Sequence, residues 1–365
     1  PLLPMIRSEF ALDYTQSGLV LSAFNLAYGF GQLPGGWLSD RIGRRTMITV
    51  GILGVALCGL VVGLSNTYIM MVVFLALMGL MGGGYHPAAS PAVSSTVAPE
   101  NRSSALGFHV IGGSASYFLA PLAAAGIAAA LGWRGPFVTL AIPTIIFGIA
   151  FYLMLGRMSE LNRAMQKSAH IETVQAAEPP GRIRRLVAFM VLSSFTQAMI
   201  FSAIAFIPLF LVDHFGVSKE AGGAFLSVFY VAGLWASTLG GYLADRFGKI
   251  RMILLSCFAM GVLTYFINLA PFGIAIGALL LIIGMFNYMR MPVAESYIIQ
   301  STSEKHRSTI LGIYFFSSME GSGVLTPLMG YIIDIMGFYY CYAIAAASVT
   351  LMTLVCFFFL RGSKD

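Results

Sequence analysis

Long apolar stretches separated by short polar segments dominate the sequence. Because a helix needs about 20 apolar residues to cross the hydrocarbon core of a bilayer, each stretch predicts one membrane-spanning helix. Eleven are expected, at residues 16–37, 46–64, 68–97, 104–131, 133–155, 186–212, 221–243, 252–269, 271–301, 308–333 and 338–360. Residues 1–6 look like the end of a further helix that is largely absent from this chain. The stretches are long, rich in glycine and not alternating, which argues against barrel strands.

The longest polar stretch, residues 157–185, divides the chain. It holds three glutamates, two prolines and three closely spaced arginines. We expect it to be a linker on the membrane surface. It joins a first helical half at 1–156 to a second at 186–365.

The composition supports a membrane protein. Hydrophobic residues make up 58% of the 365 residues and charged residues 10%, against about 45–50% and about 25% in soluble domains. This balance excludes a soluble enzyme, a nucleic-acid binder and a disordered protein. The partners expected are the lipid bilayer, a small-molecule solute and protons, and we expect a monomer.

The placement of the basic residues predicts the orientation. Seventeen of the 21 lysines and arginines fall in the linker, the C-terminal tail and the loops on the same side, whereas three fall in the opposite loops. By the positive-inside rule, the linker and the C-terminus are cytoplasmic. We expect a multi-pass protein of the cell inner membrane.

An internal repeat occurs at an offset of 205 residues. The segment 36–45, which reads GWLSDRIGRR, returns as GYLADRFGK at 241–249. The same offset relates Pro87 to Pro292, and RSSALG at 102–107 to RSTILG at 307–312. Three landmarks in one register indicate a duplicated six-helix unit. Both copies have the same orientation, because their basic loops lie on the same side.

The doubled loop, the two halves and the basic linker resemble the major facilitator superfamily of secondary transporters. The resemblance implies an all-α polytopic fold of two six-helix halves, related by a pseudo-two-fold axis along the membrane normal, with alternating access to a central site. A weaker similarity, carried by residues 84–90, is to fosmidomycin-resistance-type exporters. Drug–proton antiporters usually carry Gly-x-x-x-Gly-Pro in the fifth helix, where this chain has Ser116, Ala120 and Pro121.

The repeated loop is a candidate cytoplasmic gate. Asp40 and Asp245 each end a helix and are followed by several cations. An aspartate near the positive N-terminus of a neighbouring helix, bracketed by arginines, forms a charge cluster that a helix movement can break. The alternative is a solvated basic loop. The gate candidates are Asp40, Arg41, Arg44, Arg45, Asp245, Arg246, Arg102 and Arg307.

Arg290 is a permanent charge inside an apolar span. It must therefore face water, a carboxylate or an anionic ligand. Its fork geometry suits a carboxylate, phosphate or phosphonate. The alternative is a structural ion pair with Glu295 or Glu320. Five residues place Glu295 about 140° away from Arg290 on the same helix, which disfavours a pair within that helix and favours a pair between helices.

Glu295, Glu320 and His86 are the candidates for proton coupling. The repeat maps Glu295 onto Ser90, four residues after His86, so both groups project from equivalent faces of their helices. Each can exchange a proton near neutral pH if its environment shifts its pKa. The alternative for His86 is a hydrogen-bonded residue at a helix kink beside Pro87.

Neutral polar residues complete the candidate solute site. Asn25, Tyr28 and Gln32 share one face of the helix expected at 16–37, because their spacing is i, i+3, i+7. Glycines on the fourth helix more often indicate a close helix contact. With Arg290, the substrate-binding candidates are Asn25, Tyr28, Gln32, Tyr85, Gln197 and Asn287.

Several enzymatic motifs are absent from the sequence. It has no phosphate-binding G-x-x-x-x-G-K-[ST] loop, no hydrolase or zinc motif and no paired cysteines, so we expect neither an enzyme nor a cofactor or metal. We predict a secondary transporter for proton-coupled export of a small organic anion or drug-like solute. The alternatives are proton-linked uptake of an organic acid and an uncoupled uniporter.

Overall fold

The computed structural model describes residues 2–12, 14–168, 182–217 and 219–361, and within them the regular structure is helical. Two compact units emerge. The first comprises residues up to Ala92, Phe118 through the seventh helix, and Glu304–Ile313. The second comprises Val93–Tyr117, the chain from α8 to Ser303, and Tyr314 onward. Helices α6 and α14 thus each contribute to both units.

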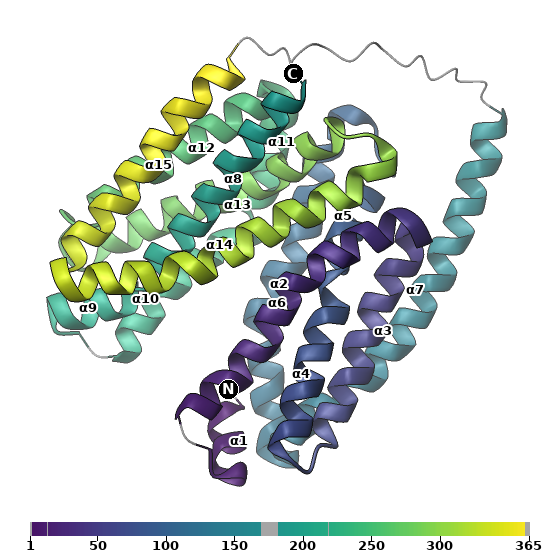
Figure 1. Cartoon of the computed structure of the whole chain (residues 1–365), viewed down its shortest axis with the longest axis horizontal. Coiled ribbons are helices and arrows are strands. Elements are labelled where there is room, and N and C mark those ends of the chain that lie inside the picture. Colours follow the sequence, from purple (N-terminus) through teal and green to yellow (C-terminus); the bar gives the residue numbers. More distant parts are fainter. Residues whose placement is uncertain (1, 13, 169–181, 218, 362–365) are drawn as a thin grey trace. The chain divides into compact units, whose positions relative to one another are not determined.

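The first unit is built on α2, α3, α4 and α7, which Figure 1 shows side by side. Helix α4 packs against both α2 and α3, and α3 packs against α7. The helices lying wholly or partly in this unit are α1 (Leu3–Phe10), α2 (Tyr14–Ile42), α3 (Arg44–Gly63), α4 (Tyr68–Gly83), α5 (Tyr85–Ser94), α6 (Arg102–Leu131) and α7 (Arg134–Ser168). The 3₁₀ turn Glu304–His306 and the start of α14 (Arg307–Met336) complete it.

Glycines bring α2 and α4 into direct backbone contact. A Cβ atom on Gly79 would lie 2.3 Å from the carbonyl oxygen of Phe24, and one on Gly83 would lie 2.6 Å from that of Tyr28. The small-residue face of the fourth span is therefore a helix–helix contact, as its composition suggested.

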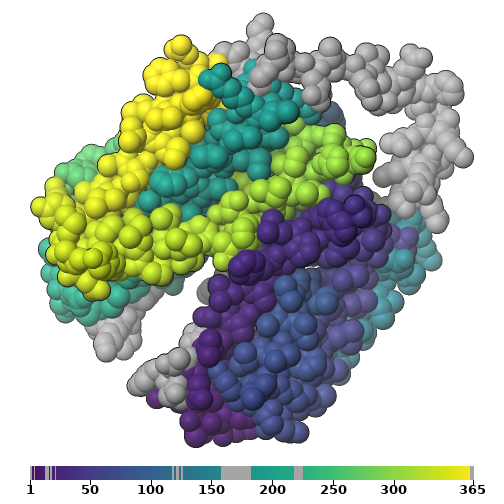
Figure 2. Space-filling model, viewed as in Figure 1, coloured from purple at the N-terminus to yellow at the C-terminus, as the bar shows by residue number. Residues whose placement is uncertain are grey.

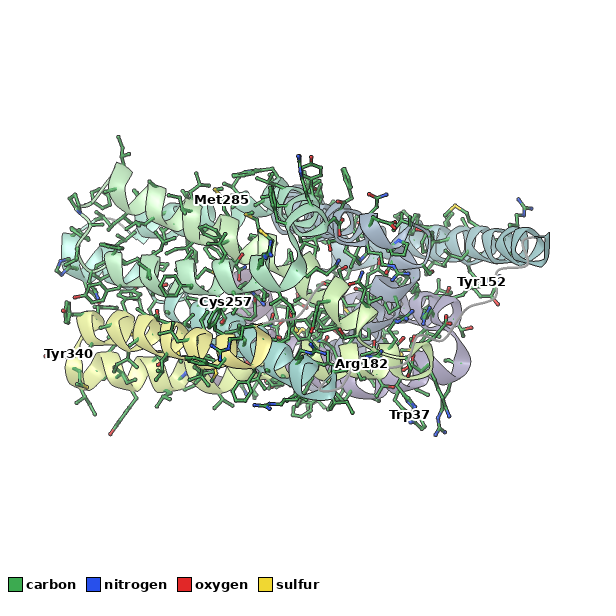
Figure 3. The ribbon with its side chains drawn as sticks, turned by 90° about the horizontal axis from the view of Figure 1, so that it is seen from above. Trp37, Tyr152, Arg182, Cys257, Met285 and Tyr340 are labelled. Atoms are coloured by element: carbon green, nitrogen blue, oxygen red, sulfur yellow. The ribbon has the colours of Figure 1, made fainter. Side chains whose placement is uncertain are left out.

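The second unit has a large apolar core formed by helices on either side of α13. Its remaining elements are the 3₁₀ turn η1 (Pro99–Asn101), α8 (Arg182–Ile204), α9 (Ile207–Phe215), α10 (Lys219–Val231), η2 (Ala232–Leu234), α11 (Ala236–Phe247), α12 (Lys249–Phe266), α13 (Ile274–Gln300) and α15 (Phe338–Leu360). Helix α15 packs against α8 and α12, and the surfaces of α8 and α15 adjoin in Figure 2. Cys257 of α12 is fully buried in this interior, whereas Tyr340 lies near the start of α15 (Figure 3).

The helices occupy all eleven ranges predicted from the sequence. Among the described residues, seven stretches are long and apolar enough to cross a membrane, or eight if the bent pair α10–α11 is one span. Helices α2, α6 and α14 are not among these, although each has 29 or 30 residues. Two boundaries differ from prediction, because α1 continues to Phe10 and α7 continues to Ser168 within the expected linker. Residues 169–181 of that linker lie outside the described part.

Three of the expected spans are interrupted. The span expected at 68–97 is broken between α4 and α5, just before His86 and Pro87. The span expected at 186–212 is broken before α9, which has a proline in its first turn. The span expected at 221–243 bends by 49° between residues 225–234 and α11. Proline accounts for the second break, because it lacks the N–H that would continue the helical ladder.

Candidate functional site

The repeated loop makes the same sharp turn in both units. Gly43 separates α2 from α3 with φ of +92°, and Gly248 separates α11 from α12 with φ of +97°. These left-handed conformations favour glycine because it has no Cβ atom. Asp40 and Asp245 lie in the last turn of the preceding helix, each three positions before the glycine of the turn.

Each aspartate caps the N-terminus of another helix in its own unit. Asp40 accepts hydrogen bonds from the backbone N–H groups of Ser308 and Thr309, at 3.0 and 2.7 Å, at the start of α14. Asp245 accepts the equivalent bonds from Ser103 and Ser104, at 3.2 and 2.9 Å, at the start of α6. A carboxylate there satisfies N–H groups without intrahelical partners and faces the positive end of the helix dipole.

Glycines allow these helices to approach closely enough for the caps to form. In the first unit, a Cβ on Gly312 would lie 2.4 Å from the carbonyl oxygen of Gln32. In the second, a Cβ on Gly107 would lie 2.5 Å from the carbonyl oxygen of Ser237. These positions are related by the offset of 205. We call each aspartate with its capped helix a carboxylate cap.

The arginines of the repeated loop have partners other than the cap aspartates. The guanidinium of Arg41 lies 3.9 Å from the Trp37 ring centroid, and that of Arg45 lies 3.7 Å from the ring centroid of Tyr152. Trp37 is exposed on the outer side of α2 (Figure 3).

Ion pairs at the two caps are not equivalent. Arg44 pairs with Glu304 at 3.6 Å, whereas Lys249 lies 3.8 Å from Asp245 itself. Arg246 donates to the hydroxyl of Tyr242 at 3.3 Å. Arg102 and Arg307 are the first residues of the two capped helices.

Arg290 is buried in the second unit, with 1% of its surface exposed. Its Nη1 donates to the carbonyl oxygen of Ser193 at 3.0 Å, to the Ser193 hydroxyl, and to the hydroxyl of Tyr314 at 3.4 Å. Its Nη2 donates to Oε1 of Gln197. Helices α8, α13 and α14 therefore supply the neighbours of this charge.

The two edges of the Arg290 guanidinium differ. The Nη1 group is held by Ser193 and Tyr314, whereas the side-on edge formed by Nε and Nη2 has Gln197 as its partner. Nε itself has no hydrogen-bond partner among the described residues. Within that part of the chain no carboxylate forms an ion pair with Arg290, so the two pairings considered from the sequence, with Glu295 and Glu320, are not seen.

Asn287 lies one helical turn before Arg290 on α13. Its side chain is fully buried, and neither Oδ1 nor Nδ2 has a hydrogen-bond partner in the described part of the chain. Gln197 is only half-buried, so it lies on the more accessible side of this cluster. Arg290, Gln197 and Asn287 are three of the seven predicted substrate-binding residues.

The other four predicted substrate-binding residues belong to the first unit. Asn25 is exposed, Tyr28 and Tyr85 are half-buried, and Gln32 is 1% exposed. The Tyr28 ring lies against α4, since a Cβ on Gly82 would be 3.3 Å from it. Gln32 lies where α2 crosses α14. These four stay predictions as solute contacts.

The proton-coupling candidates have different environments. Glu295 is 3% exposed on α13. Glu320 on α14 and His86 on α5 are half-buried. The His86 ring lies edge-on to that of Tyr85, at a centroid distance of 5.5 Å. His86 belongs to the first unit and the two glutamates to the second.

One polar cluster was not identified from the sequence. Oε2 of Glu9 accepts from Nε1 of Trp133 and from Nη1 of Arg134, both at 2.7 Å. Arg134 also donates to the carbonyl oxygen of Ser65 at 2.8 Å. These hydrogen bonds, led by that from Arg134, lower the pKa of Glu9 below its usual 4.5. The cluster joins α1, the α3–α4 loop and the start of α7.

Comparison with known proteins identifies the family. A family model described as Major Facilitator Superfamily matches residues 1–206 and 187–365. The chain therefore belongs to the major facilitator superfamily. It is a multi-pass membrane transporter of a small-molecule solute and not an enzyme.

Curated relatives cover most of the chain. A probable sulfoacetate transporter of Cupriavidus necator is 26% identical over 360 residues, which span 92% of this chain and 83% of the relative. A hexuronate transporter of Bacillus subtilis is 22% identical over 92% of this chain and 83% of its own. A cis,cis-muconate transport protein of Acinetobacter baylyi is 24% identical, with coverages of 90% and 81%.

Solved structures share the fold. The transporter FucP in its outward conformation has a TM-score of 0.74 at 18% identity, over 100% of this chain and 94% of that one. The proton:xylose symporter XylE has a TM-score of 0.75 at 15% identity, with coverages of 98% and 90%. Together with the family match, these similarities confirm the predicted all-α, major facilitator type of fold.

Proposed function

We propose that this chain is a proton-coupled transporter of a small organic anion and that Arg290 binds the anionic group. The observation that carries the proposal is the buried guanidinium of Arg290, which has no carboxylate partner in the described chain. An unneutralised buried charge is costly, and neutral oxygens compensate only part of that cost. An anionic solute supplies the missing charge.

The geometry of Arg290 favours an oxyanion. A carboxylate or sulfonate can accept two parallel hydrogen bonds from the side-on edge of a guanidinium. At Arg290 that edge consists of Nε, without a partner among the described residues, and Nη2, bonded to Gln197. The amide oxygen of Gln197 thus occupies the position of one solute oxygen. Sulfoacetate, hexuronate and muconate, for which three relatives are named, are all organic anions.

The carboxylate caps fit a gate. In alternating access, helices at one end of the protein must separate in one state and close in the other. Asp40 and Asp245 hold helix N-termini through short polar contacts that a small helix movement breaks. We assign them to the end predicted to be cytoplasmic.

Gln197→Glu provides the sharpest test of Arg290 as the anion site. A carboxylate at position 197 would pair with the side-on edge of Arg290 and should keep the protein folded. It should also compete with the solute, so that binding of organic anions falls roughly a hundredfold or more. Gln197→Ala, which frees the same edge, should bind anions at least as well as the wild type.

Thermal stabilisation by carboxylates and sulfonates would measure binding in both variants. Arg182→Lys provides a control, because Arg182 donates to the carbonyl oxygen of Ser301, which follows α13. Unchanged anion binding in Gln197→Glu would show that the Arg290 edge does not bind solute. Stabilisation only by lipophilic cations would reject the organic-anion assignment.

The sign of the pH gradient that drives solute accumulation distinguishes antiport from symport. We propose proton antiport, hence export, as the first hypothesis. Proton-linked uptake is the second hypothesis. It is favoured because Ser116 and Ala120 stand where drug–proton antiporters usually carry the two glycines of Gly-x-x-x-Gly-Pro. In proteoliposomes, antiport accumulates solute when the interior is acidic, and symport when the exterior is acidic. Equal uptake under both gradients would instead indicate an uncoupled uniporter.

A further inference from the structure

Asn287 is a buried amide whose hydrogen-bonding groups are unused. The side chain has no exposed surface, and both its acceptor Oδ1 and its donor Nδ2 lack partners among the described residues. Burial of a polar group without a hydrogen bond is unfavourable, and an amide leaves two groups unsatisfied at once. Buried polar groups without partners are uncommon in folded proteins, so this one calls for a specific explanation.

The position of Asn287 relates it to the proposed anion site. Three residues separate it from Arg290, which corresponds to a rise of about 4.5 Å and a rotation of about 60° between the two side chains. Both therefore project from the same face of α13. The guanidinium of Arg290 retains a side-on edge for an oxyanion, and the amide lies about one turn from it.

The chemistry of an amide defines its missing partner. Oδ1 needs a donor and Nδ2 needs an acceptor. A hydroxyl group supplies both functions, and two adjacent hydroxyl groups can satisfy both amide atoms together. A methylene chain supplies neither, and a second carboxylate or sulfonate supplies only acceptors.

We propose that the solute is a hydroxylated organic acid, in which Arg290 binds the acid group and Asn287 binds a hydroxyl group about one helical turn away. The inference rests on the proposed function, because it requires Arg290 to bind the anion. It assigns the solute to the class of sugar acids and related hydroxy acids. Unsubstituted carboxylates, dicarboxylates and simple sulfonates should bind more weakly.

A pair of probes tests this preference in the wild-type protein. Gluconate and hexanoate both have six carbons and one carboxylate, and they differ in their hydroxyl groups. Gluconate should bind at least about tenfold more tightly than hexanoate, because a site that leaves a buried polar group unpaired rejects the analogue without the hydroxyl. Binding is measured by thermal stabilisation and by competition with transport of labelled solute.

Asn287→Leu then tests the residue. Leucine has the same branched side-chain skeleton and no polar atom, so the fold should be retained. Gluconate binding should fall roughly tenfold or more, whereas hexanoate binding should change by less than about threefold. Ser296→Ala is the matched control, because it removes a different buried polar group of α13, a hydroxyl without a hydrogen-bond partner among the described residues. It should leave the gluconate-to-hexanoate ratio unchanged.

The outcomes separate this inference from the proposed function. If neither acid binds the wild type and Gln197→Glu changes nothing, the organic-anion assignment itself fails. If both acids bind equally well, or Asn287→Leu weakens both in parallel, Arg290 binds anions and Asn287 does not recognise a hydroxyl group. A ratio that collapses in Asn287→Leu and persists in Ser296→Ala supports the inference.

Discussion

Thr309 donates two hydrogen bonds to the same oxygen of Asp40. Its backbone N–H and its hydroxyl each lie 2.7 Å from Oδ2. Ser104 makes the same two contacts with Oδ2 of Asp245, both at 2.9 Å. The two pairs are related by the internal repeat, so the duplication preserved the cap together with the hydroxyl that completes it. This agreement supports a shared role for the two carboxylate caps.

Removal of either cap should loosen the first turn of the helix that it holds. Asp40→Ala deletes the acceptor of three hydrogen bonds, and bonds to a charged group contribute about 1.5–3 kcal/mol each. We expect the amide protons of Ser308 and Thr309 to exchange roughly ten to a hundred times faster. Hydrogen-exchange mass spectrometry of the peptide around residues 305–313 would measure this change.

The two caps provide controls for each other. Asp245→Ala should accelerate exchange at the start of α6 and leave the start of α14 protected, the reverse of Asp40→Ala. Glu304→Gln removes an ion pair whose glutamate is 79% exposed, so it should have almost no effect. Faster exchange at both helices in each single variant would mean general destabilisation and not loss of a local cap.

The close helix crossings predict a second set of effects. Gly107→Ala and Gly312→Ala each place a Cβ within 2.5 Å of a carbonyl oxygen. The helices would have to separate, at a cost of about 1–3 kcal/mol. Both variants should lower the Tm of the purified protein and weaken protection at the neighbouring cap.

Two other glycines of α6 give the opposite expectation. A Cβ on Gly112 or Gly113 would meet no atom within 4 Å. In an open helical position, alanine is favoured over glycine by up to about 1 kcal/mol. Gly112→Ala and Gly113→Ala should therefore leave Tm unchanged or raise it slightly. A decrease in Tm equal to that of Gly107→Ala would contradict the steric argument.

Hydrophobic patterning was sufficient to predict where the helical spans lie, but not where three of them are interrupted. The ends of α3, α12 and α15 lie within a few residues of the predicted spans, because an apolar run must match the thickness of the bilayer. The repeat also led directly to the caps, since Asp40 and Thr309 both belong to segments that recur at 205 residues. Their pairing required the structure, because a spacing in sequence does not say which helices pack together.

The environment of Arg290 was only partly predictable. Its position inside an apolar span marked it as exceptional, and Gln197 was a candidate on the facing helix. Tyr314 was missed, since a tyrosine in an apolar span gives no signal of a polar role. The carboxylates considered as partners were chosen by charge alone, whereas hydroxyl and carbonyl oxygens of α8 and α14 surround the guanidinium.

The Glu9 cluster predicts a pH-dependent contribution to stability. Hydrogen bonds from Arg134 and Trp133 lower the pKa of Glu9 below 4.5 in the folded protein. A lowered pKa means that the contribution is complete above 4.5 and is lost as the pH falls through the folded-state pKa. The Glu9 side chain is 42% exposed, so the contribution should not exceed about 1 kcal/mol.

Glu9→Gln should isolate that contribution. The variant should have a lower Tm than the wild type at pH 7, and the difference should shrink as the pH falls below 4.5. Glu100→Gln, which removes an exposed carboxylate from η1, should show no difference at either pH. A gap between wild type and Glu9→Gln that widens on acidification would reverse the sign and reject the argument.

Proton coupling should depend most strongly on Glu295. A carboxylate buried in a membrane protein is costly as an anion, so gain and loss of its proton can be tied to movement of the site. Glu295 is 3% exposed, whereas Glu320 and His86 are half-buried. Glu295→Gln resembles the permanently protonated form. It should abolish accumulation of solute driven by a pH gradient and retain exchange of labelled for unlabelled solute, which requires no net proton movement.

Glu320→Gln, the matched control on α14, should retain at least about half of the driven accumulation. Both activities are measured in proteoliposomes; driven accumulation that survives in Glu295→Gln but not in Glu320→Gln would transfer the coupling role to Glu320.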